Sequence, residues 1–398
     1  MNIKETLRSG GPDYDKCLVN LSNSILKSFG AETSAATLPS ADAYLSGNHK
    51  NVVLLLLDAL GISILEKHLS EDGFFRSHLK DTYYSVYPPT TVAATTSVLS
   101  ALYPNEHGWL GWDVYFPELD KNVTVFRNLE QQKEKKDAAP TVLNKEHCWE
   151  WGSDSLEEAA SAADFHAGFT YTPYKNIIDR INEAGGRAYF SMPFMPPYPD
   201  DLEKILARVK ELCEEDGRKF IYAYWNEPDS TMHRTGTMSP ESRELVRSLE
   251  ERIRSFASEL SDTLLIITAD HSHMDSRNLC ILDHPEVMDC LVRMPSIEPR
   301  TLNLFVKDEH IETFPEIFRK AFGEDFLLLK REEVLKEKLF GPGEDRPGLS
   351  EMIGDYVALS TGSTSVFNTH YEAQMMPGGH AGLTAEENLI PLIVVEIL

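Results

Sequence analysis

The stretch NVVLLLLDALG, residues 51–61, decides the fold class, because it joins a buried strand to an acidic turn. Residues 52–57 form a continuous apolar run, as in a strand covered on both faces, and Asp58 follows directly. Similar runs alternate with helical patterns along the chain, which indicates a largely parallel sheet covered by helices. The expected strands are residues 52–57, 188–191, 220–225, 263–268 and 392–397.

Helical periodicity predicts helices over residues 92–102, 174–184, 201–214 and 240–260. The pattern changes after residue 288, where a strand, a helix and another strand precede a Gly-Pro-Gly loop. We therefore expect residues 289–351 to form a small inserted α/β subdomain. Residues 1–288 and 352–398 would then make up the main domain.

Composition limits the partners that the chain can bind. Its 63 acidic and 38 basic residues give a formal net charge of −25. This field opposes binding to a nucleic-acid polymer or an anionic membrane, and it repels a phosphate substrate unless cations occupy the site. The N-terminus has no apolar run and the five cysteines form no Cys-x-x-Cys pair. We expect no secretory signal, no membrane segment, reduced thiols and a cytoplasmic protein.

Carboxylates and histidines lie beside the expected strand ends, where ligands bind in open α/β sheets. Together, such side chains suit zinc, manganese or iron better than calcium. The candidate metal ligands are Asp58, Asp229, His233, Asp270, His271 and His380.

Each candidate ligand taken alone has an ordinary alternative. Asp58 could cap the following helix. Asp229 and His233 are four residues apart, so a helical turn brings both to one face, as a chelate needs, but a surface pair has the same spacing. His273, two residues after His271, leaves the choice of histidine open. The coincidence of these residues at several strand ends favours the metal site.

Six segments in the chain resemble those of the alkaline phosphatase superfamily, and within it the type I phosphodiesterase/nucleotide pyrophosphatase group. They are NVVLLLLDALG from Asn51, YPPTT ending at Thr91, LYPNEHG from Leu102, PDSTMH ending at His233, TADHSHMD from Thr268 and GHAGLTAEE from Gly379. The segments follow the family's order, over about residues 50–295 and 352–398. The resemblance implies an alkaline-phosphatase-like three-layer α/β/α sandwich with a mostly parallel central sheet.

The resemblance also implies two divalent metal ions, with zinc expected and manganese as the alternative. One metal would be held by Asp58, Thr91, Asp270 and His271, and the other by Asp229, His233 and His380.

The same resemblance points to a threonine nucleophile. In nucleotide pyrophosphatases the nucleophile precedes the histidine of the Tyr-Pro-x-x-His-Gly segment by sixteen residues, and counting back from His107 gives Thr91. Thr90 is the alternative. Thr95 and Thr96 lie a turn further on and are expected to pack the helix.

The activity implied is hydrolysis of a phosphodiester or nucleotide pyrophosphate through a phospho-threonine intermediate, with a small phosphate ester such as a nucleotide as substrate. One departure concerns Trp112, which stands where the family usually has an asparagine that binds a phosphoryl oxygen. Trp112 and Trp109 could line the leaving-group site or belong to the core. The absence of Lys or Arg between Lys80 and Lys121 favours a diester or a pyrophosphate, which carries less charge at the reacting phosphorus. The alternatives are a phosphomonoesterase, a phosphosugar mutase or a catalytically silent metal-binding protein.

Overall fold

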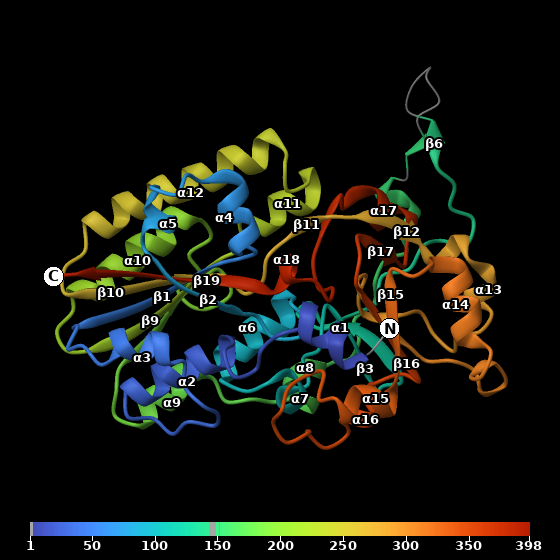
Figure 1. The fold of residues 1–398 in the computed structure, drawn as a ribbon, viewed down its shortest axis with the longest axis horizontal. Coiled ribbons are helices and arrows are strands. Elements are labelled where there is room, and N and C mark those ends of the chain that lie inside the picture. Colours follow the sequence, from blue (N-terminus) through green and yellow to red (C-terminus); the bar gives the residue numbers. More distant parts are fainter. Residues whose placement is uncertain (1–2, 143–148, 151) are drawn as a thin grey trace.

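The computed structural model describes residues 3–142, 149–150 and 152–398, and its two larger sheets lie end to end (Figure 1). The first sheet has six strands in the order β2-β19-β10-β1-β9-β8. Its strands are β1 (Asn51–Leu57), β2 (Leu79–Tyr84), β8 (Ala188–Ser191), β9 (Lys219–Trp225), β10 (Thr263–Thr268) and β19 (Leu389–Ile397).

The centre of this sheet is parallel, and one strand runs the other way. β1 pairs in parallel with both β9 and β10, and β8 pairs in parallel with β9. β19 is antiparallel to β10 and to β2. Every residue of β1 is buried, because the strand is covered on both faces, as its apolar run predicts. The expected mostly parallel sheet is confirmed.

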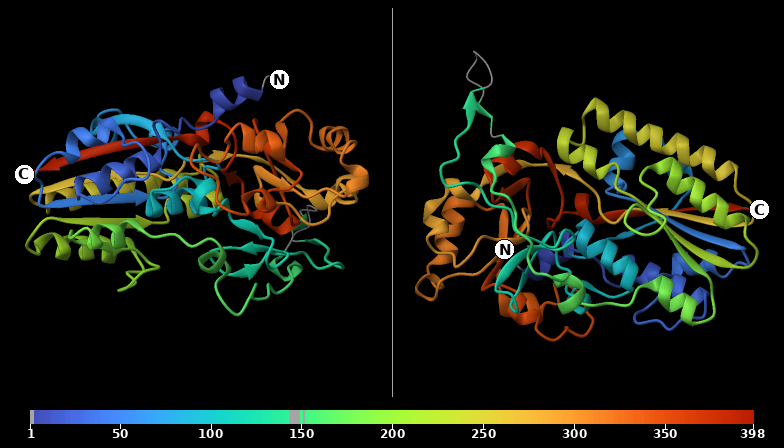
Figure 2. Two further views of the ribbon diagram at one scale, coloured as in Figure 1. Left: turned by 90° about the horizontal axis from the view of Figure 1, so that it is seen from below. Right: turned by 180° about the vertical axis from the view of Figure 1, so that it is seen from behind.

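Helices cover both faces of the first sheet and complete three layers (Figure 2). One layer contains α4 (Ile62–His68), α5 (Phe74–Ser77), α10 (Leu202–Glu214) and α12 (Pro240–Ser258). The other contains α2 (Leu18–Ser28), α3 (Pro39–Leu45), α6 (Thr91–Ser100) and α9 (Ile177–Glu183). The helices expected from the sequence all form, with ends that differ by a few residues. For instance, α6 stops before Ala101, which has a left-handed φ of 58°.

The remaining helices are short. They are α1 (Ile3–Gly10), α7 (Pro104–His107), α8 (Ala167–Tyr171), α11 (Asp229–Thr235), α13 (Pro285–Met288), α14 (Phe314–Phe322), α15 (Arg331–Lys336), α16 (Leu349–Met352), α17 (His370–Met375) and α18 (Ala385–Asn388). Three 3-10 turns cover Ser153–Ser155, Ile281–Asp283 and Asp308–His310.

The second large sheet has seven strands in the order β15-β16-β14-β13-β3-β4-β5. Its strands are β3 (Asp113–Phe116), β4 (Lys121–Thr124), β5 (Leu129–Glu130), β13 (Ser296–Glu298), β14 (Thr301–Leu304), β15 (Phe326–Lys330) and β16 (Tyr356–Ser360). This sheet contains strands from outside the expected subdomain, residues 289–351. Strands β3 to β5 come earlier in the chain, and β16 comes later. Pairing over such distances leaves no local pattern in the sequence.

Three two-stranded pairs complete the strands. They are β6 (Thr141–Val142) with β7 (Trp149–Glu150), β11 (Met274–Asp275) with β18 (Gly378–Gly379), and β12 (Arg277–Cys280) with β17 (Thr364–Phe367).

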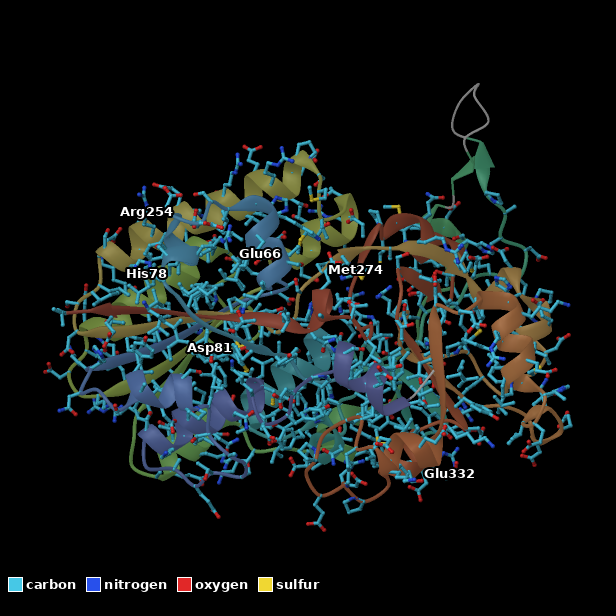
Figure 3. All side chains as sticks on the ribbon, in the orientation of Figure 1. Glu66, His78, Asp81, Arg254, Met274 and Glu332 are labelled. Atoms are coloured by element: carbon cyan, nitrogen blue, oxygen red, sulfur yellow. The ribbon has the colours of Figure 1, made fainter. Side chains whose placement is uncertain are left out.

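A buried ion pair fastens the second sheet to the first. Arg300, in the turn between β13 and β14, donates to both carboxylate oxygens of Glu387 in α18, at 2.7 and 2.9 Å. The side chains are 1% and 0% exposed. Glu387 also accepts from the backbone N–H of Gly382, in the loop that leads into β19. Met274, labelled in Figure 3 between the two halves of the molecule, lies 3.2 Å from Arg300 through its sulfur.

Within the described ranges, no helix is long and apolar enough to cross a membrane. Cys17, Cys213, Cys280 and Cys290 are buried free thiols, whereas Cys148 lies outside the described residues.

We predict that Glu387→Gln lowers the free energy of unfolding by about 3–5 kcal/mol, because it leaves the Arg300 guanidinium buried without a countercharge. Urea titration of the purified variant measures this. Lys204→Ala is the matched control, since Lys204 pairs with Asp200 and Asp201 on the surface, where solvent screens the charges, and its loss should leave the urea midpoint close to that of the wild type. Equal stability of the Glu387→Gln variant and the wild type would contradict the role of the ion pair.

Candidate active site

The predicted ligands meet at one edge of the first sheet. Asp58 follows β1, Asp229 begins α11 after β9, and Asp270 follows β10. These strands are parallel, so their carboxyl ends share this edge. His380 reaches the same edge because β19 is antiparallel and therefore begins where the others end. The backbone N–H of Asp229 donates to the carbonyl oxygen of Asp58 at 3.2 Å, which joins two of the turns directly.

Asp58, Asp270 and His271 form the first group of possible metal ligands, and all three are buried. The Nε2 atom of His271 lies 3.4 Å from Oδ1 of Asp58 and 3.6 Å from Oδ2 of Asp270. The Thr91 hydroxyl lies 3.3 Å from the same Nε2 and 3.4 Å from Oδ2 of Asp58. The structure thus brings Thr91 to the group with which the resemblance associates it.

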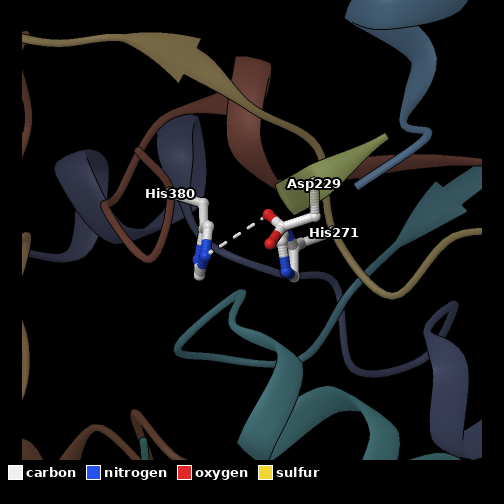
Figure 4. A group of neighbouring side chains, drawn as sticks. All are labelled: Asp229, His271 and His380. Carbon is white, nitrogen blue, oxygen red and sulfur yellow. Dashed lines mark ion pairs between the residues drawn. The ribbon is translucent and has the colours of Figure 1, made fainter. Parts of the chain in front are cut away.

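The second group centres on Oδ1 of Asp229. The Nε2 atoms of His233 and His380 lie 3.4 and 3.8 Å from it and 3.2 Å from each other. His233 follows Asp229 by one turn of α11, which places both on one face. Figure 4 shows His380 directed towards Asp229, with His271 beside them. Asp229, His271 and His380 also have ligand atoms close enough to share an ion, so the two groups are contiguous.

Three histidines are oriented by backbone carbonyl groups. Nδ1 of His271 lies 2.9 Å from the oxygen of Ser272, and Nδ1 of His233 lies 3.0 Å from that of Gly378. Nδ1 of His380 lies 3.2 Å from the oxygen of Pro89. A carbonyl oxygen only accepts, so Nδ1 carries the proton in these bonds and Nε2 presents a lone pair to the centre. This is the arrangement found in metal-bound histidines.

The carboxylates at the centre also favour the binding of divalent cations. Burial raises the pKa of Asp270 to about 7 and, with the neighbouring Asp270 and Asp229 carboxylates, raises the pKa of Asp58. Although burial opposes it, the adjacent histidines lower the pKa of Asp229. Oδ1 of Asp229 and Oδ2 of Asp270 are buried without a hydrogen-bond partner. Bound cations would compensate the carboxylates and give these atoms partners.

Thr91 is oriented by its place at the start of α6, and its neighbour Thr90 is turned away. The Thr90 hydroxyl donates to Oε1 of Glu298 at 2.6 Å. α6 is held in turn by His107, whose ring bonds the hydroxyl of Ser97 and the backbone N–H of Trp109, each at 3.0 Å. Of the two threonines weighed from the sequence, Thr91 therefore faces the ligand groups.

Three further residues at the centre, Tyr224, His273 and Glu298, were not assigned from the sequence. Tyr224 donates to Oδ2 of Asp58 at 2.5 Å. Nε2 of His273 lies 3.3 Å from Oδ1 of Asp229, and neither nitrogen of this buried ring has a hydrogen-bond partner. The short spacing from His271 was the only signal for His273. Tyr224 lies within a strand and Glu298 in the second sheet, so neither has a motif.

A cavity of about 500 Å³ opens from the ligand groups towards the second sheet. Thr91, Asp229 and His380 lie on its wall together with Glu298 and Trp112. Trp112 is 40% exposed and Arg127 lies over its ring, whereas Trp109 is 1% exposed and packs in the core. Of the two tryptophans, only Trp112 can therefore border a substrate.

Comparisons with known proteins identify the family of the chain. The family model for type I phosphodiesterase/nucleotide pyrophosphatase matches residues 52–335. A venom phosphodiesterase of Macrovipera lebetinus is 24% identical over 166 residues, which are 42% of this chain. The match spans only 17% of that relative's length.

Solved structures show the same fold. Murine ectonucleotide pyrophosphatase/phosphodiesterase 5, as an inactive variant in complex with AMP, superposes with a TM-score of 0.60 at 16% identity, covering 86% of this chain and 87% of that one. The human protein of the same name gives a TM-score of 0.61 at 15% identity, with the same coverage. These structures establish the fold, and the family model covers most of the chain. The chain belongs to the type I phosphodiesterase/nucleotide pyrophosphatase family.

Proposed function

We propose that this protein is a metal-dependent hydrolase that cleaves phosphodiester or nucleotide pyrophosphate bonds through a phospho-threonine intermediate. The observation that carries the proposal is the position of the Thr91 hydroxyl, 3.3–3.5 Å from His271 and Asp58 at the start of α6. A hydroxyl at this position can attack a phosphorus atom whose oxygens face the first N–H groups of the helix.

We assign the ligands to two cations as the family resemblance implies. Asp58, Thr91, Asp270 and His271 would hold one divalent cation, and Asp229, His233 and His380 the other. Zinc or manganese suits this mixture of carboxylate and imidazole donors. When bound, such cations lower the pKa of a hydroxyl or water and neutralise charge on phosphoryl oxygens.

The reaction then has two steps. Thr91 passes its hydroxyl proton to solvent and its oxygen bonds to phosphorus, while the bond from phosphorus to the bridging oxygen breaks and the leaving group departs with that oxygen and its electron pair. Water next attacks the same phosphorus, the bond to Thr91 breaks, and the threonine regains a proton. Nδ1–H bonds to backbone carbonyls keep His233, His271 and His380 from turning away during both steps.

The lining of the cavity supports a diester or pyrophosphate substrate. Arg300 lines it but is engaged by Glu387, and Arg127 and Arg234 line it as well. Their cations could receive the second phosphate of a pyrophosphate, and Trp112 offers a ring face to a base. The AMP bound to the murine relative supports a nucleotide-type substrate. We also propose a reducing, cytoplasmic location, which the free thiols support.

Thr91→Ala should lower kcat on the p-nitrophenyl ester of thymidine monophosphate by at least on the order of 10³-fold, because it removes the attacking oxygen. Release of p-nitrophenol measures the rate. Thr95→Ala is the matched control, since it removes a hydroxyl one turn along α6 that donates to the carbonyl oxygen of Thr91. Full turnover by Thr91→Ala would rule out the threonine mechanism.

Metal analysis of the purified protein should find about two equivalents of zinc or manganese. Asp229→Asn should lose roughly one equivalent, because Asp229 holds the second cation in the proposed division of the ligands. Dialysis against a chelator should abolish activity, and adding the metal back should restore it. A metal-free preparation with full activity would refute metal dependence.

The wild type should cleave bis-p-nitrophenyl phosphate with a kcat/KM on the order of tenfold or more above that for p-nitrophenyl phosphate, because the segment between Lys80 and Lys121, which carries Thr91, supplies no Lys or Arg to compensate the second charge of a monoester. Parallel assays of the two substrates test this. The reverse preference would favour a phosphomonoesterase.

A further inference from the structure

Glu298 is a buried acid at the cavity wall that the proposed reaction does not yet use. It ends β13, in the second sheet, and is 9% exposed. It lines the same cavity as Thr91 and His380. It belongs to none of the metal-ligand groups in the described part of the chain.

The hydrogen bonds of Glu298 fix one of its oxygens and leave the other available. Oε1 accepts from the Thr90 hydroxyl at 2.6 Å and from the backbone N–H of Trp112 at 2.8 Å. Oε2 has no hydrogen-bond partner among residues 3–142, 149–150 and 152–398. The carboxyl group is therefore held beside Thr90, which precedes the proposed nucleophile Thr91. Its Oε2 atom is available to a ligand in the cavity.

No cation neutralises Glu298 within the described ranges, since it takes part in no ion pair there. Arg300, two residues further on, is occupied by Glu387. Burial, with smaller contributions from Asp113 and Asp229, raises the pKa of Glu298 to about 8. The charged and titratable groups that share the cavity wall are Asp113, Arg127, Asp229, His233, Arg234, Arg300, Glu372 and His380.

The backbone partner of Glu298 is the residue that departs from the family pattern. The family's asparagine, whose amide binds a phosphoryl oxygen, is replaced here by Trp112. The Trp112 side chain turns towards Arg127 and Phe126, whereas its backbone N–H binds Glu298. Position 112 thus lacks an amide side chain, and the carboxyl group of Glu298 lies beside it.

We propose that Glu298, as a neutral carboxylic acid, donates the hydrogen on Oε2 to a non-bridging phosphoryl oxygen of the substrate and so supplies the contact that Trp112 cannot make. This rests on the proposed function. A neutral carboxylic acid donates a hydrogen bond to the phosphoryl oxygen, whereas a carboxylate repels it. The protonated form of Glu298 is therefore the active one. Activity should fall as pH rises through the pKa of Glu298.

Glu298→Gln is the decisive variant. Its amide keeps the oxygen that accepts from Thr90 and Trp112, and it offers an N–H donor at every pH. With bis-p-nitrophenyl phosphate, we expect wild-type kcat/KM to decline above pH 8 or so, near the pKa of Glu298. The variant should lack this decline and stay within about threefold of the wild type at neutral pH.

Glu298→Ala separates donation from mere support of the fold. Losing one phosphoryl donor should lower kcat by roughly 10²–10³-fold with little change in KM. Glu106→Gln is the matched control, because Glu106 is a partly buried acid with a raised pKa that caps Tyr103 away from the cavity. It should keep the wild-type pH profile.

The inference is overturned if Glu298→Gln retains the wild-type alkaline decline, if the wild type shows no such decline, or if Glu298→Ala has full kcat. Glu298→Gln decides the question even if the alanine variant does not fold. Thr91→Ala, assayed alongside, distinguishes the two claims. Wild-type turnover that disappears in Thr91→Ala upholds the proposed function, whatever Glu298 does.

Discussion

Two buried carboxylates, from Asp58 and Asp270, and the partly buried carboxylate of Asp229 gather with histidine rings at the edge of the first sheet. Buried charges of one sign are costly unless cations or hydrogen bonds compensate them. Few hydrogen bonds do so here, since one oxygen each of Asp229 and Asp270 has no partner. The architecture around them follows from this constraint. Parallel strands deliver the carboxylates, and an antiparallel strand delivers His380 to the same edge.

The same constraint connects the charge of the whole chain to the proposed chemistry. A net charge of −25 repels phosphate esters from most of the surface. Divalent cations at the ligand groups would reverse the potential locally, at the one edge where Thr91 faces the cavity. The second sheet closes this cavity from the other side, and the buried pair of Arg300 and Glu387 holds that sheet against the loop that carries His380.

Local patterns in the sequence predicted the parts that local forces determine. The apolar run before Asp58 is a strand because it is buried on both faces, and the spacing of Asp229 and His233 places both on one face of α11. The predicted ligands lie together because the parallel strands that precede them end at the same edge of the sheet. The extent of the second sheet could not be predicted, since β3 pairs with β13 almost two hundred positions later in the chain. Glu298 reaches Thr90 only through that pairing, so its place at the site required the structure.

The stereochemical course of the reaction tests the central claim most directly, because each in-line displacement inverts phosphorus. A chiral p-nitrophenyl phosphorothioate diester of thymidine would be hydrolysed in water enriched in heavy oxygen, and the configuration of the product determined. Attack by Thr91 followed by attack of water comprises two inversions, so the account predicts net retention. Net inversion would mean that water attacks the substrate directly, and it would contradict a phospho-threonine intermediate.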